Sequence, residues 1–154
     1  MPDAADIVIS VKPKYAARIL SGEKSIELRR RRMRVAPGSR VWIYTKSPDA
    51  HISAYAVVEE IINLEPRELW RKHRNAVGVS LAEFNDYFVG VAVAWAMVLR
   101  DVRPLAPALR LSELRSRPCR FHPPQFFKRL QEGSPELSLL RARSKRPTTS
   151  AKFA

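Results

Sequence analysis

The segment from Val89 to Val102, VGVAVAWAMVLRDV, is apolar at almost every position up to Arg100. A strand with one face in water alternates apolar and polar residues, whereas a strand covered on both faces keeps a continuous apolar run. The segment therefore predicts a strand in the middle of a small sheet or barrel. The rest of the chain must supply the strands on either side of it.

Four earlier segments have the composition or the spacing of strands. Residues 6–11 read DIVISV, residues 40–45 read RVWIYT and residues 51–62 read HISAYAVVEEII. From Ser25 onward, apolar residues alternate with polar ones, which is the period of a strand. The chain thus offers enough strands to surround the central run.

Helical patterns fall between these strands. Residues 13–22 begin with a proline and stop at a glycine, and residues 65–76 place leucine and tryptophan on one side. Residues 80–90 begin with SLAE, a capping box, and end at a glycine. The order of strand, helix, three strands, two helices and strand predicts an α+β domain built on a small β-barrel.

The length of 154 residues, of which 45% are hydrophobic, suits one domain with a real core. We expect that domain to cover residues 1–140. Residues 141–154 carry five basic side chains and no acidic one, so we expect a basic, disordered tail there.

Aromatic residues after the central strand are concentrated in the stretch FHPPQFFKRL. Proline suits the first turn of a helix, so a short helix is predicted to begin at Pro123 or Pro124. We expect this helix to pack Phe126, Phe127 or Leu130 onto the body of the domain.

The formal charge of +13 favours polyanions as partners, and nucleic acid is the commonest. An acidic membrane surface, or solubility alone, would be compatible with the same charge. No apolar run reaches the roughly 18 residues that span a bilayer, the N-terminus MPDAAD is acidic, and the lone Cys119 cannot form an intramolecular disulfide. We expect a cytoplasmic protein with RNA, or DNA, as its partner and no membrane partner; the sequence leaves a protein partner open.

The three histidines His51, His73 and His122 are far apart in the sequence. None of them has a cysteine or carboxylate at the spacing of metal ligands. We therefore expect no metal site and no cofactor.

The stretch from Ser21 to Arg34, SGEKSIELRRRRMR, combines a strand pattern with many charges. Glu27 and Arg29 point to the same side of the strand, about 7 Å apart, and Lys24 enters the strand just before them. The carboxylate can accept a hydrogen bond from a nucleobase amine, and the two cations can meet a phosphate or carbonyl oxygen. A structural ion pair at a barrel rim is the alternative interpretation.

Residues 8–31, VISVKPKYAARILSGEKSIELRRR, resemble the ASCH superfamily, whose signature is Gly-x-Lys-x-x-Glu-x-Arg. In this chain the signature reads Gly22, Lys24, Glu27, Arg29. The resemblance continues through GSRVWIYTKSP, GVSLAEFNDYFVG, LSELR and PPQFFKRL, and so covers residues 7–130. It implies a PUA-like small β-barrel with short flanking helices, and binding of RNA or of modified nucleobases at the barrel mouth.

Further residues are candidates for the same mouth. Candidates for contacting nucleic acid are Arg31, Tyr44, Lys46, Ser47 and Gln125. The cations and the hydroxyl can bind phosphate, a tyrosine can stack on a base, and the amide can bond a base edge. Each residue also has a structural interpretation: Arg31 can belong to a solvated rim, Lys46 and Ser47 to a Ser-Pro turn, Tyr44 to the core, and Gln125 to a helix cap. Tyr87 is another candidate for stacking on a base.

Three functions from different classes follow. The first is binding of RNA or of a modified nucleobase by Lys24, Glu27 and Arg29. The second is a metal-independent ribonuclease, in which the same three side chains supply a base, an acid and a positive charge that stabilises the phosphoryl group. The third is hydrolysis of an acylated nucleoside, which some ASCH members perform. Against it, those members have Thr where Glu27 stands, and Val77 falls near the place of their second catalytic carboxylate. A structural or protein-interaction role would predict no nucleotide-sized pocket around Glu27.

Overall fold

The structure, a computed structural model, describes residues 2–146 of the chain. In chain order the elements are β1 (Asp6–Val11), α1 (Pro13–Ser21), β2 (Ile26–Arg29), β3 (Arg40–Thr45), β4 (His51–Leu64), α2 (Pro66–His73), α3 (Leu81–Tyr87), β5 (Ala94–Arg110), α4 (Leu111–Arg115), β6 (Phe127–Leu130) and α5 (Pro135–Ser144). The predicted α+β class is confirmed.

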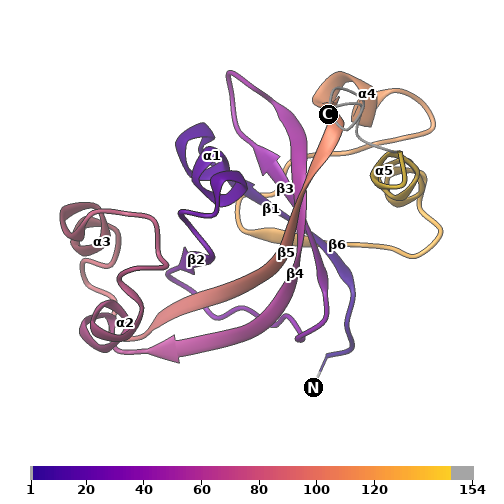
Figure 1. Cartoon of the computed structure of the whole chain (residues 1–154). Helices are drawn as coiled ribbons and strands as arrows, with labels where there is room; N and C mark the ends of the chain where they lie inside the picture. Colours follow the sequence, from indigo (N-terminus) through magenta and orange to yellow (C-terminus); the bar gives the residue numbers. More distant parts are fainter. Residues whose placement is uncertain (1, 147–154) are drawn as a thin grey trace.

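The strands form one curved sheet in the order β2-β5-β4-β3-β1-β6. Only β1 and β3 pair in parallel among the strands that the structure describes. The predicted central position of the apolar run is confirmed, because β5 lies between β2 and β4. In Figure 1, α2 and α3 cover one end of the long β4–β5 ribbon, and α4 and α5 lie toward the other end.

The start of the central strand differs from the prediction. It begins at Ala94, which pairs with Leu64 at the very end of β4. Residues 89–93 therefore have no partner strand beside them, in spite of their apolar composition. They form the segment that leads from α3 into the sheet.

The helix predicted at Pro123 or Pro124 is wrong. Residues 127–130 form the edge strand β6, in which Phe127 pairs with Ile9 and Leu130 with Asp6. Pairing with the exposed edge of β1, more than a hundred residues away in the sequence, overrides the local helix signal.

The C-terminal boundary also falls elsewhere. Helix α5 runs from Pro135 to Ser144 and buries Leu137 and Leu140 against the sheet, so the boundary expected at residue 140 lies inside a helix. Arg143 is buried and donates to the carbonyl of Pro107 at 2.6 Å. The rest of the predicted tail, from residue 147 on, lies outside the described residues.

The local helix signals were accurate. Helix α1 begins at Pro13, and its C-cap Gly22 has φ +86°, a left-handed conformation that glycine adopts without strain. Helix α3 has the predicted capping box: Ser80 accepts from the Glu83 amide, and the Glu83 carboxylate accepts from the Ser80 amide. These two caps fix the helices that form the walls of the candidate site.

Candidate nucleic-acid site

A cavity of about 170 Å³ lies between β1, β2, α1 and α3. Its walls contain four cations, two carboxylates and three aromatic rings: Lys12, Lys24, Arg29, Lys46; Glu27, Glu83; Tyr15, Phe84, Tyr87. The volume corresponds to that of roughly six water molecules, which suits a small ring system and not a folded oligonucleotide.

Lys24 is buried at the base of this cavity. Its Nζ donates a hydrogen bond of 2.7 Å to the carbonyl of Val77 and lies 5.4 Å from the centre of the Tyr15 ring. Burial lowers the pKa of Lys24 from its ordinary value; Glu27 opposes this effect, and Arg29 adds to it. Its ammonium is thus a stronger acid than that of an exposed lysine.

The loop before α3 holds this lysine in place. The Ala76 carbonyl accepts from the Ser25 amide at 2.9 Å, and the Gly78 carbonyl accepts from Arg18 at 2.8 Å. Gly78 has φ +62°, and a Cβ added there would collide with the Cβ of Lys24. Only glycine lets the backbone approach the lysine so closely.

Glu27 and Arg29 line the same cavity without forming an ion pair with each other. Glu27 Oε1 accepts from the amide of Leu28 at 3.0 Å, and an Arg29 terminal nitrogen donates to the carbonyl of Ser10 at 3.3 Å. Glu27 Oε2 and Arg29 Nε are buried, and neither has a hydrogen-bond partner within residues 2–146. Buried polar atoms are normally paired, so a ligand with a donor and an acceptor is the natural partner for both.

Four charged or aromatic side chains of this cavity were not predicted from the sequence: Lys12, Tyr15, Glu83 and Phe84. Tyr15 donates to Glu83 Oε2 at 2.9 Å, and Lys14 donates to the same oxygen at 2.9 Å. The Lys14 hydrogen bond, with those from the Ser80 amide and Tyr15, lowers the pKa of Glu83 to about 2. The capping box marked this glutamate only as a helix start, so no local signal pointed to the cavity.

Tyr87, weighed from the sequence as a stacking residue, also lines the cavity. Its hydroxyl donates to the carbonyl of Leu28 at 3.2 Å, and burial raises the pKa of this phenol. The hydroxyl is held against β2, so the ring forms a fixed wall beside Glu27 and Arg29.

The structure separates the other predicted residues. Lys46 lines the cavity, whereas Ser47 and Gln125 are exposed and lie outside its lining. Tyr44 is buried in the core against Phe121, so the core interpretation holds for this tyrosine.

Arg31 is exposed on the rim that follows β2. Its guanidinium lies over the ring of Phe126, 5.0 Å from the ring centre. It sits outside the cavity lining, where it can meet a phosphate but not a base within the cavity.

Within the described range, no group of three or more His, Cys, Asp or Glu side chains is arranged to hold a metal ion. None of the helices in residues 2–146 is long and apolar enough to cross a membrane.

Residues 5–131 match the family model described as "Domain of unknown function (DUF365)". An "ASCH domain-containing ribonuclease" of Zymomonas mobilis is 35% identical over 125 residues, which are 81% of this chain and 84% of that protein. A crystal structure of ASCH from Zymomonas mobilis is 32% identical and superposes with a TM-score of 0.84, over 91% of this chain and 96% of that one.

A more distant structure shares the fold alone. The human THYN1 protein, solved in complex with 5-methylcytosine containing DNA, is 10% identical and has a TM-score of 0.52. It covers 94% of this chain and 100% of its own. Together with the ASCH structures, it supports the predicted PUA-like fold.

Proposed function

The chain belongs to the DUF365 family and is an ASCH domain protein, and on that premise we propose that it is a ribonuclease that binds single-stranded RNA. The base of one nucleotide enters the cavity, and Lys24, Glu27 and Arg29 cleave the chain beside it without a metal ion. The ribonuclease name of the Zymomonas mobilis relative supports the reaction class.

One observation supports this proposal above all others: a buried carboxylate oxygen and a buried guanidinium nitrogen line one cavity, and neither is paired within residues 2–146. A structural ion pair would have joined Glu27 to Arg29. Their separation leaves one acceptor and one donor for a ligand, as recognition of a nucleotide requires.

The cleavage step assigns a role to each side chain. The Glu27 carboxylate takes the proton from the ribose 2′-hydroxyl as its oxygen attacks the neighbouring phosphorus. Arg29 stabilises the negative charge that develops on the phosphoryl oxygens. The Lys24 ammonium, whose pKa burial lowers, donates the proton that the leaving 5′-oxygen needs.

The approach to the cavity is electrostatic. The chain has a net charge of +13, and the run Arg29–Arg32 leads away from the cavity along and beyond β2. Such a rim attracts the phosphate backbone of any sequence, while the cavity tests the base. DNA would be attracted equally but lacks the 2′-hydroxyl that the proposed reaction uses.

The structure adds an argument against the acylated-nucleoside reaction. The side chain of Val77 is fully buried in the cluster beneath α2 and α3, and only its carbonyl reaches Lys24. The position at which those hydrolases carry their second carboxylate thus provides no acid or base here.

The test uses labelled single-stranded RNA in EDTA, with binding and cleavage scored on paired gels. We expect wild type to cleave, and Glu27→Gln to bind but not cleave. Arg103→Met, which changes an exposed arginine of β5 outside the cavity lining, should cleave like wild type. Binding by wild type without cleavage would reduce the proposal to a binding module, and failure to bind RNA would refute it.

A further inference from the structure

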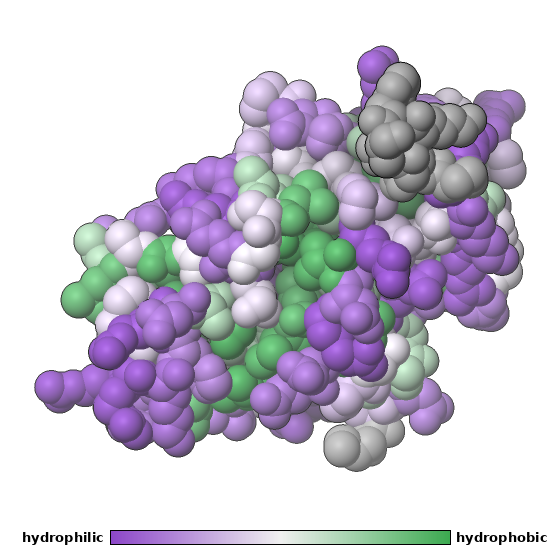
Figure 2. Space-filling model, viewed as in Figure 1, coloured by the Kyte–Doolittle hydropathy of each residue, from purple (hydrophilic) through white to green (hydrophobic). Residues whose placement is uncertain are grey.

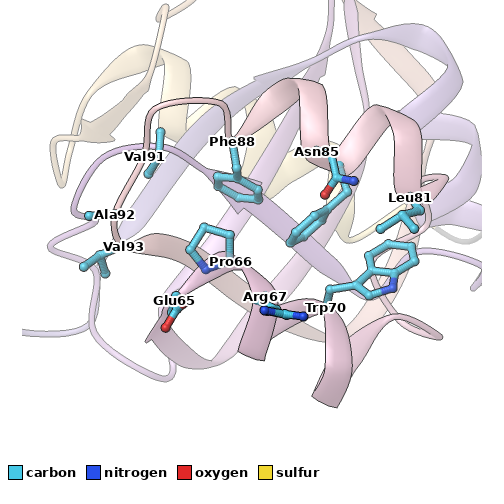
Figure 3. A pocket seen from close by; sticks show the side chains of 11 residues that line it. Glu65, Pro66, Arg67, Trp70, Leu81, Asn85, Phe88, Val91, Ala92 and Val93 are labelled. Carbon is cyan, nitrogen blue, oxygen red and sulfur yellow. The ribbon is translucent and has the colours of Figure 1, made fainter.

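A second hollow lies on the other side of α3. It is a groove of about 900 Å³ between α2, α3 and the segment from Phe88 to Val93. Figure 3 shows Trp70 and Leu81 at one end, Val91 and Val93 at the other, and rings between them. The walls are mostly apolar and contain two charged side chains, Glu65 and Arg67, where the cavity has six.

Exposed apolar side chains are concentrated at this groove. Among the described residues five large hydrophobic side chains are exposed. Leu81 and Val93 line the groove and Val89 follows its lining residue Phe88, whereas Tyr87 lines the cavity on the other side of α3. The fifth, Leu20, belongs to α1. In Figure 2 hydrophobic surface appears at the end of the molecule that carries α3. A cluster of this kind on a soluble domain marks a contact surface.

Val89 protrudes beside the groove and does not line it. It is 67% exposed, more than any other large hydrophobic residue described. It stands on a tight turn in which the Val91 amide donates to the Phe88 carbonyl at 3.0 Å. Arg30 donates to the Val89 carbonyl at 3.2 Å, which ties the turn to the segment after β2. An exposed valine, in a turn tied by two hydrogen bonds, thus stands next to the hollow.

The charge of this face differs from that of the whole chain. The lining of the groove contains one acidic side chain, Glu65, and one basic one, Arg67, and Arg30 lies beside it at the Val89 carbonyl. The whole chain carries +13. A neutral apolar face does not attract a polyanion, and it is where two copies of so basic a chain can meet with least repulsion.

We propose that this groove is the interface between two copies of the chain. A two-fold interface places the same patch on both partners, so it requires a surface that complements itself. The projection and the hollow lie on one face and provide this: Val89 of each copy enters the groove of the other. The inference uses none of the cavity residues in their proposed roles and does not depend on the ribonuclease proposal.

The test is sedimentation velocity of the full chain across a wide range of protein concentration, at low and high salt. We expect a dimer that becomes tighter as salt rises, because salt screens repulsion between the basic bodies. Val89→Asp and Leu81→Asp should each raise the dissociation constant by about 100-fold or more, since each change occurs twice in the interface. Leu20→Asp places the same charge on an exposed hydrophobic residue of α1, outside the groove lining, and should leave the dimer intact.

Two results would overturn the inference. One is a wild-type chain that stays monomeric at every concentration, which would leave the groove to another protein. The other is a dimer that survives both groove substitutions. All of these sites are exposed, and circular dichroism will show whether the variants are folded, so loss of the dimer can be separated from unfolding.

Discussion

Helix α3 separates two hollows that differ in size and in the charge of their walls. On one side, Glu83 and Tyr87 face a small cavity that is lined by four cations and two carboxylates. On the other, Leu81 and Asn85 face an open, mostly apolar groove, and Phe84 lines both. Unpaired polar atoms that are buried indicate a small polar ligand, whereas apolar side chains left in water indicate another protein surface.

The difference follows from the seven residues of α3 itself. Its sequence, LAEFNDY, places an acid and a tyrosine on one side and a leucine and an amide on the other. Its capping-box glutamate also accepts from Lys14 and Tyr15 of α1, so the cap that starts the helix joins it to the cavity wall. The same short helix therefore serves both hollows, and substitutions can address them separately.

The largest expected effect tests the cavity. Lys24→Met keeps the length of the side chain but removes the proposed proton donor, so we expect RNA cleavage to fall by about 10²–10⁴-fold. Lys72→Met, on the exposed face of α2, should cleave at the wild-type rate. Rates measured in EDTA for both variants decide this, and equal rates would remove Lys24 from the reaction.

The second test concerns how closely the loop approaches Lys24. Gly78→Ala should destabilise the fold by about 2–3 kcal/mol, because it combines a left-handed backbone with a collision at Lys24. Gly90 also has a positive φ, +76°, but an added Cβ there meets nothing within 4 Å. Gly90→Ala should therefore cost only about 1 kcal/mol. Urea unfolding of the two variants measures the difference, and equal losses would show that the contact with Lys24 contributes little.

The sequence predicted the parts of the site that depend on local spacing. Gly22 ends α1, and the strand that follows brings Glu27 and Arg29 to one side, as the two-residue period requires. The capping box that begins α3 was also predicted from the sequence and is confirmed. These features depend on residues that are near one another in the chain.

The rest depends on contacts between distant residues. The Val77 carbonyl that holds Lys24 is 53 residues away from it, and β6 forms only because the edge of β1 is available to it. Residues 89–93 have strand composition but lie beyond the end of their partner strand. Composition alone could not show that these residues would flank a groove.

The third test uses the pH dependence of stability. Burial lowers the pKa of Lys24 in the folded protein below 10.5, the ordinary value expected in the unfolded chain. Between these two values the unfolded chain binds more protons, so the free energy of unfolding rises with pH, by at most about 1.4 kcal/mol per unit. Lys24→Met lacks this contribution. Urea titrations over an alkaline pH series should thus show wild type gaining stability relative to the variant, and parallel curves would contradict the burial effect.

The smallest effect tests the contrast in charge between the two surfaces. Arg31 lies on the basic rim, so Arg31→Ala should reduce the slope of log affinity for RNA against log salt by about one. Arg67 lies in the groove, where Glu65 balances its charge, so Arg67→Ala should leave that slope unchanged. Filter binding of single-stranded RNA at several salt concentrations measures both slopes. If Arg67→Ala lowered the slope as much as Arg31→Ala, RNA would contact the groove. The groove would then not serve only as the interface with a second copy of the chain.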